Sequence, residues 1–129
     1  MGTVRRHTFV DCNADKVWSF VGAPERLHEW FPITECRVEG NKRWITLAAG
    51  IVFEEDIITL DQDLRRFQYK IVNNSLIKFH LGTVDVIPDG DNRCLVMYST
   101  DMDPEVLALP IAGAASLGLE KIKQMFDGK

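Results

Sequence analysis

The sequence has little of what marks several large classes of protein. Its cysteines, Cys12, Cys36 and Cys94, are odd in number and far apart, so they predict neither a disulfide framework nor a zinc site. The formal net charge is -4, and no basic stripe suited to nucleic acid is present. No apolar run is long enough for a signal peptide or a membrane span. We therefore expect a cytoplasmic protein with reduced thiols, no nucleic-acid partner and no membrane span.

Signatures of common catalytic and cofactor sites are also missing. The sequence has no nucleophile elbow, no phosphate-cradling glycine loop, and no HExxH or CxxC motif. His7, His28 and His80 show no ligand-like spacing. We expect neither a metal nor a cofactor.

What the chain does have is the composition of an ordinary globular protein. Its 129 residues are 46% hydrophobic and 26% charged. This length predicts one domain, residues 1–129, with a core of useful size.

The spacing of apolar residues changes twice along the chain. A first strand, Thr3–Val10, precedes two short helices, one capped by Asn13 and one opened by Pro24. Six strands then follow between residues 35 and 101, and the alternation is clearest in Arg66–Val72. A long helix closes the chain, with Asp103 as its predicted cap, Pro104 at its first position, and Pro110 as a kink or restart. Short links between the strands favour an antiparallel meander, and the order predicts an α+β fold.

Several short stretches, taken in order, resemble one superfamily. They are Val17-Trp18, Trp30-Phe31-Pro32, Cys36–Gly40, Arg43, Glu55, Asp61, Tyr69 and Gly118-Leu119. In this arrangement the chain resembles the SRPBCC superfamily of START domains, birch-pollen-allergen relatives and abscisic-acid receptors, and within it the bacterial polyketide cyclase/dehydrase group. The resemblance implies a helix-grip fold: about seven antiparallel strands curved round the long C-terminal helix, with a ligand cavity between them. This fold hosts carriers, receptors and enzymes, so function must be argued from the site.

Alternation along the strands, with the register of that family, predicts which side chains face the helix. The inward residues expected to bind a ligand are Phe53, Ile57, Phe67, Tyr69, Ile71, Val84, Val96 and Tyr98. Strands 77–87 and 93–101 are apolar on both faces, so a bulge would reverse their assignment.

The closing helix adds Ile111, Ala114, Ala115 and Gly118 to the expected ligand site. Small side chains there either leave space beneath the helix or let helix and sheet approach closely. The resemblance favours a cavity. Ile122 and Phe126 are expected to close one end of it.

Glu55 and His80 are the candidate catalytic residues. A carboxylate that faces an apolar pocket must find partners or raise its pKa, and could then act as a general base. The competing interpretation places Glu55 on a charged surface, within the run Glu54–Asp56. A histidine can exchange a proton near neutral pH, although a lone strand histidine is more often a core residue.

Other polar and aromatic residues have both functional and structural interpretations. Tyr69 and Tyr98 could bond a ligand or simply pack, whereas Arg43 is expected to form a structural ion pair. Trp18, Trp30 and Phe31 should pack the short helices against the rim of the sheet. Thr34 stands where plant hormone receptors carry a ligand-pairing lysine, which favours a neutral or aromatic ligand.

Three functions remain open from the sequence, one of them a stress or interaction protein whose pocket is vestigial. The first is binding of a small hydrophobic or aromatic molecule without chemistry. The second is a cofactor-free cyclase, aromatase or dehydratase in which Glu55 or His80 moves protons while the pocket positions a poly-carbonyl chain. An exposed edge strand would also allow a homodimer.

Overall fold

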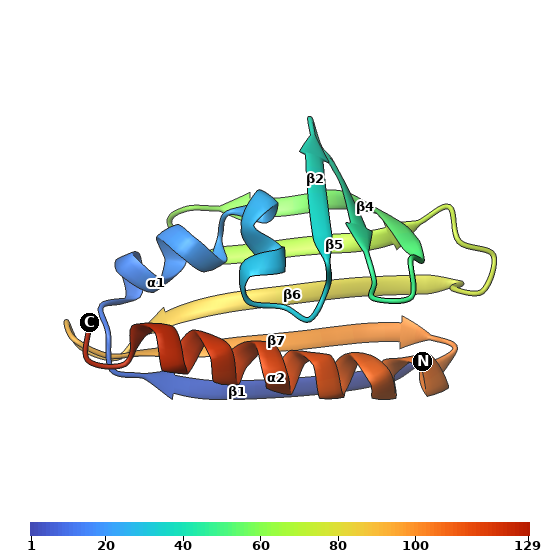
Figure 1. Ribbon diagram of the computed structural model, residues 1–129. Helices are drawn as coiled ribbons and strands as arrows, with labels where there is room; N and C mark the ends of the chain where they lie inside the picture. The colour runs from blue at the N-terminus through green and yellow to red at the C-terminus, as the bar shows by residue number, and fades with distance from the viewer.

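The chain forms one curved antiparallel sheet of seven strands with a long C-terminal helix lying along it (Figure 1). The computed structural model describes residues 1–129. The strands are β1 (Gly2–Val10), β2 (Glu35–Glu39), β3 (Lys42–Thr46), β4 (Val52–Asp61), β5 (Arg66–Val72), β6 (Phe79–Pro88) and β7 (Cys94–Asp103). The helical segments are α1 (Ala14–Val21), the 3₁₀ turns η1 (Pro24–Glu29) and η2 (Glu105–Leu107), and α2 (Ala108–Phe126).

The strand order confirms the predicted meander and helix-grip fold. In the sheet the order is β1-β7-β6-β5-β4-β3-β2, so strands 2 to 7 each pair with their neighbours in sequence. The first strand crosses to the far side and pairs with the last, and α2 packs against both (Figure 1). The remaining strands curve away from the helix, which leaves space between α2 and β3 to β6.

Local sequence explains where the first helices begin and end. The Asn13 side chain accepts hydrogen bonds from the backbone N–H groups of Asp15 and Lys16, as a helix cap does. Pro24 stands at the first position of η1, where a missing N–H leaves no helical bond unmade. Both predicted helices are therefore present, the second as a 3₁₀ helix.

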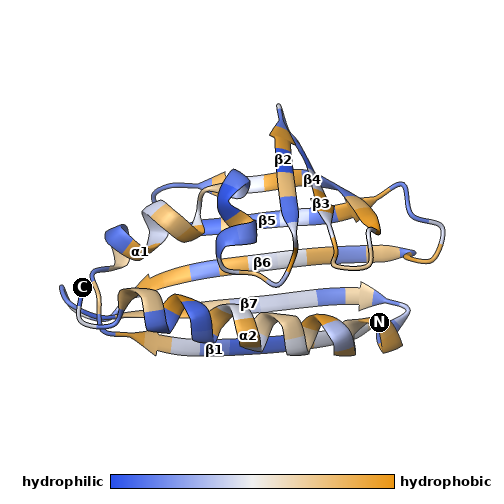
Figure 2. Cartoon of the chain, in the orientation of Figure 1, coloured by the Kyte–Doolittle hydropathy of each residue, from blue (hydrophilic) through white to orange (hydrophobic).

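Burial confirms the predicted inward faces of the last three strands. Phe67, Tyr69 and Ile71 are buried on β5, and on β6 and β7 alternate residues from His80 to Val86 and from Cys94 to Thr100 are buried. Neither long strand therefore reverses its faces. Hydrophobic and hydrophilic residues also alternate along α2, as in an amphipathic helix (Figure 2).

The predicted start of the closing helix was wrong. Asp103 is the last residue of β7, where it pairs with Phe79, and its carbonyl accepts a hydrogen bond from Lys78. Because the backbone of Asp103 is paired with β6, it cannot start a helix, and α2 begins only at Ala108. Pro110 is the third residue of α2, inside the first turn, where its missing N–H has no helical acceptor. Neither α1 nor α2 combines the length and hydropathy of a membrane-crossing helix.

Candidate ligand-binding cavity

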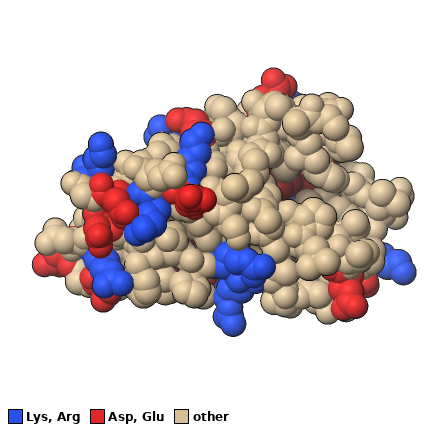
Figure 3. All heavy atoms as spheres, turned by 60° about the horizontal axis from the view of Figure 1, so that its bottom comes forward, with Lys and Arg blue, Asp and Glu red and all other residues tan.

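A cavity of about 300 Å³ lies between the sheet and the N-terminal half of α2. Eleven of its fifteen lining residues are hydrophobic. The lining comprises Phe31, Pro32, Ile45, Leu47, Phe53, Glu55, Tyr69, Ile71, Ile77, His80, Met102, Leu107, Pro110, Ile111 and Ala114. Figure 3 shows a hollow in the surface with acidic atoms at its base, and Glu55 is the acidic residue of the lining. The cavity is thus an apolar chamber with few polar groups.

The predicted site residues divide between three places. Seven line this cavity: Phe53, Glu55, Tyr69, Ile71, His80, Ile111 and Ala114. A second, much smaller cavity is lined by Phe67, Val84 and Tyr98, and also by Tyr69. Ile57 is partly buried against the core and Val96 lies wholly within it, and neither lines this cavity.

The predicted place of the cavity along α2 needs correction. Ala115 and Gly118 are buried in the core and do not line the space. A Cβ atom added to Gly118 would lie 3.0 Å from Cε3 of Trp30, so this glycine lets the indole pack directly on the helix. Ala115 and Gly118 therefore let α2 pack closely against the rest of the protein, and the cavity lies nearer the start of the helix.

Sequence reasoning missed eight residues of the lining. Ile45 and Leu47 follow Arg43 at a spacing of two, and Met102 follows Thr100 in the same way, so strand alternation could have found them. Phe31 had been expected only to pack a helix against the rim. No periodic signal marks the remaining lining residues, which lie in loops, at the end of η2 or in the first turn of α2: Pro32, Ile77, Leu107 and Pro110.

Glu55 is paired with Arg43 across neighbouring strands. The two residues face each other in the β3–β4 register, and Arg43 Nε donates to Glu55 Oε1 at 2.6 Å. Their side chains are only 2% and 1% exposed. Arg43 also donates to the carbonyl of Pro24 at 3.1 Å, and its guanidinium lies 4.9 Å from the Tyr69 ring centre. The predicted structural ion pair of Arg43 is confirmed, and its partner is the residue that reaches the cavity.

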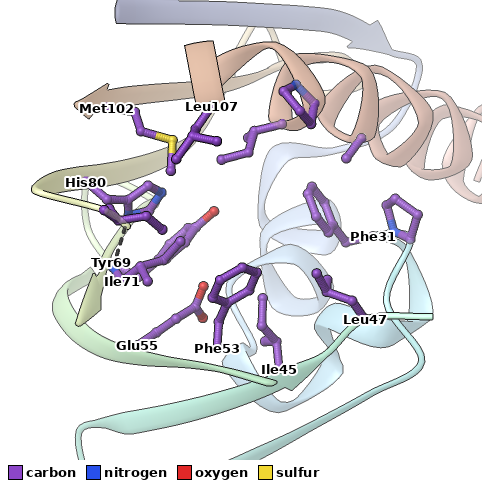
Figure 4. A pocket seen from close by; sticks show the side chains of 15 residues that line it. Phe31, Ile45, Leu47, Phe53, Glu55, Tyr69, Ile71, His80, Met102 and Leu107 are labelled. Carbon is purple, nitrogen blue, oxygen red and sulfur yellow. Dashed lines mark hydrogen bonds between the residues drawn. The ribbon is translucent and has the colours of Figure 1, made fainter. Parts of the chain in front are cut away.

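One oxygen of the Glu55 carboxyl has no partner in the protein. Figure 4 shows this group directed into the cavity, and Oε2 makes no hydrogen bond within the protein. Burial raises the pKa of Glu55 above its ordinary value, while the charge and hydrogen bond of Arg43 act in the opposite direction. The sequence-based alternative of a surface Glu55 is therefore wrong.

His80 presents a hydrogen-bond donor to the same cavity. Its Nδ1 accepts a hydrogen bond of 3.0 Å from the backbone N–H of Ile71, so in the neutral ring the proton is on Nε2. Burial lowers the pKa of His80 to about 4, which keeps the ring neutral at physiological pH. Figure 4 shows the far edge of the ring turned toward the open space.

The hydroxyl groups of Tyr69, which lines the cavity, and of Tyr98, which does not, form a buried hydrogen bond with each other. Burial raises the pKa of both, so both stay protonated. The Tyr69 ring packs directly against the backbone of Gly82 on β6, because a Cβ atom added there would overlap Cζ of Tyr69. Tyr98 in turn stacks on Phe31, with ring centres 5.6 Å apart. These contacts fix the aromatic wall.

Comparison with known proteins places the chain in a family. A family model described as "Polyketide cyclase / dehydrase and lipid transport" matches residues 1–127. The chain belongs to this family. A search of curated proteins found no match.

Solved structures share its fold at low sequence identity. XoxI from Bacillus cereus has a TM-score of 0.88 at 23% identity, covering 98% of this chain and 96% of that one. A START superfamily protein from Mycobacterium smegmatis has a TM-score of 0.79 at 14% identity, covering 97% and 99%. Norcoclaurine synthase from Thalictrum flavum, solved with dopamine and hydroxybenzaldehyde, has a TM-score of 0.75 at 18% identity, covering 95% and 84%. At these identities the likeness establishes the helix-grip fold.

Proposed function

We propose that the protein binds a small, uncharged, largely apolar or aromatic molecule in the cavity beneath α2, with a hydroxyl or similar donor directed at Glu55. The observation that carries this proposal is an apolar chamber of about 300 Å³ with a free carboxyl oxygen at its inner wall. Ligand pockets generally range from ~300 to ~1,000 Å³, so the occupant is small.

The charges around the cavity support an uncharged ligand. Glu55 is already neutralised by Arg43, and both side chains are almost fully buried. A cationic or anionic ligand would therefore add an uncompensated charge to an apolar space, which is strongly unfavourable. His80 cannot serve as a counter-ion because its ring is neutral.

The hydrogen-bonding groups support a ligand with both a donor and an acceptor. The free oxygen of Glu55 accepts a hydrogen bond, and Nε2 of His80 donates one. A hydrogen bond to a charged group contributes about 1.5–3 kcal/mol. An aromatic alcohol should therefore bind more tightly than the hydrocarbon of the same shape.

A matched series of bicyclic ligands tests the proposal. Calorimetric titration with 2-naphthol, naphthalene, 2-naphthoate and 2-naphthylmethylammonium varies one substituent on one ring system. We expect 2-naphthol to bind tightest, with naphthalene about tenfold weaker and both ions weaker still. If none of the four binds, the binding function fails; if an ion binds best, the charge argument fails.

The second candidate function is proton transfer on a bound carbonyl compound. It is favoured by one observation, that Glu55 and His80 line the same cavity while burial raises the pKa of Glu55. Glu55 would remove a proton from the carbon beside a carbonyl, and His80 Nε2–H would hydrogen-bond to the carbonyl oxygen. The family description includes cyclases and dehydrases, which agrees with such chemistry.

Deuterium exchange separates this candidate from simple binding. The ketone 2-tetralone has the shape of 2-naphthol and carries exchangeable protons beside its carbonyl. An enzyme should accelerate their exchange in D₂O, and Glu55→Gln should abolish the acceleration while leaving His80→Phe partly active. If the wild-type protein binds 2-tetralone without accelerating exchange, the protein is a binder.

A further inference from the structure

A second cavity lies on the other side of the Tyr69 ring and is far smaller than the first. It has a volume of about 10 Å³, near the lower limit for one water molecule. Eight of its nine lining residues are hydrophobic, and the ninth is Arg43. An organic ligand cannot fit there.

Two hydrogen-bond donors in the wall of this cavity have no partner in the protein. They are Nε1 of Trp30 and Nη2 of Arg43, on residues that are only 3% and 2% exposed. Both residues line the cavity. Buried polar atoms almost always have a partner, and an orphan commonly marks a bound water or ion.

Both unpartnered groups are donors, which defines the chemistry of the occupant. An indole nitrogen and a guanidinium donate hydrogen bonds and cannot accept them. The charge of the guanidinium is already compensated by Glu55, so the occupant carries no charge. The occupant must therefore be a hydrogen-bond acceptor the size of a single heavy atom.

We propose that this small cavity is a binding site for one such acceptor, a water molecule, that bridges Trp30 Nε1 and Arg43 Nη2. The bridge completes the bonding of the guanidinium, whose other groups bind Glu55 and the carbonyl of Pro24. It thereby links the segment after η1 to β3 and holds Arg43 in the position that orients Glu55.

High-resolution crystal structures with and without bromide test the site. We expect a peak of density in the small cavity, within hydrogen-bond distance of both donor atoms. Density without an anomalous signal in crystals grown in bromide identifies water, and an anomalous signal there would show an ion and contradict the proposal. Absence of the peak, or a rearrangement that gives both donors protein partners, overturns the proposal.

Two tryptophan variants show whether the indole donor holds the occupant. Trp30→Phe removes the N–H but keeps an aromatic ring, and the peak should disappear or lose at least half its occupancy. Trp18→Phe is the matched control, because the Trp18 indole donates to Gln62 at 2.7 Å and lies outside the lining of this cavity. A peak unchanged in Trp30→Phe contradicts the bridge. If Trp30→Phe does not fold, the wild-type crystals decide.

Discussion

The buried Arg43–Glu55 ion pair places a carboxyl group at the cavity wall. Burial of either charge is favourable only while its partner is present. Removing one partner of a buried pair leaves the other charge uncompensated, at a cost of about 3–5 kcal/mol. We therefore expect Glu55→Gln to lower the free energy of unfolding by roughly that amount, measured by urea denaturation.

An exposed ion pair provides the control for this variant. Arg26 and Glu29 are bonded at 2.8 Å, but both side chains are largely solvated. Glu29→Gln should leave the free energy of unfolding close to that of the wild type. Equal effects of the two substitutions would show that Glu55 is not buried with its partner as described.

Gly82 is predicted to be essential for the position of Tyr69. A methyl group there would overlap the Tyr69 ring, so Gly82→Ala must displace the ring and its hydrogen bond to Tyr98. We expect a loss of about 1–3 kcal/mol in thermal or chemical unfolding. Gly113→Ala is the matched control, because an added Cβ there meets nothing and the position is helical; it should stabilise by about 0.5–1 kcal/mol. A neutral Gly82→Ala would contradict the described packing.

His80 gives the protein a pH dependence of known sign. Its pKa is about 4 when folded, against 6.5 for the free side chain, so between these values the unfolded chain binds the proton more tightly. The contribution of His80 to the free energy of unfolding is fully present above pH 6.5 and decreases as the pH falls. Below pH 4 the whole contribution, about 3 kcal/mol, is lost. Glu55 acts in the opposite direction because its pKa is raised.

The contribution of His80 is isolated by comparing pH profiles. Urea denaturation of the wild type and of His80→Gln at several values between pH 4 and 7 should show a steeper loss in the wild type. NMR of the wild-type ring should show the proton on Nε2 at pH 7. A ring that becomes charged at pH 6 would contradict the burial described for it.

At the scale of elements, it is the first turns of α2 that line the cavity. Ala114 lines it, whereas Ser116 is exposed on the outer face of the same helix. Ala114→Trp should fill the space and weaken 2-naphthol binding at least tenfold, and Ser116→Trp should leave it unchanged. Calorimetry measures both. Equal affinities of the two variants for 2-naphthol would show that the ligand does not bind beneath α2.

How far the sequence predicts these elements depends on how local the signal is. Strand alternation places Tyr69 on the inner face, and Asn13 marks a helix start, because both effects act within a few residues. The inward assignment of Glu55 and His80 needed the strand register of the resembled family as well. The start of α2 was missed because pairing of Asp103 with Phe79 on β6 is a long-range contact. The level of the cavity was missed for the same reason, since it depends on Trp30 packing against Gly118.

At the scale of the whole molecule, the space under α2 is closed at one end and open at the other. At the closed end Ile122 is fully buried and Phe126 packs on Phe20, with ring centres 5.4 Å apart. The sequence predicted this closure. At the other end Leu107, Pro110 and Ile111 border the cavity instead of filling it. The proposed ligand site therefore lies at the N-terminal end of α2.

The most direct test of the account is a crystal structure of the protein with 2-naphthol. We predict that the ring system lies between Phe31, Phe53 and Ile111, with its hydroxyl within hydrogen-bond distance of the free oxygen of Glu55. A ligand bound on the outer surface, or a chamber that has collapsed onto packed side chains, would contradict the central claim.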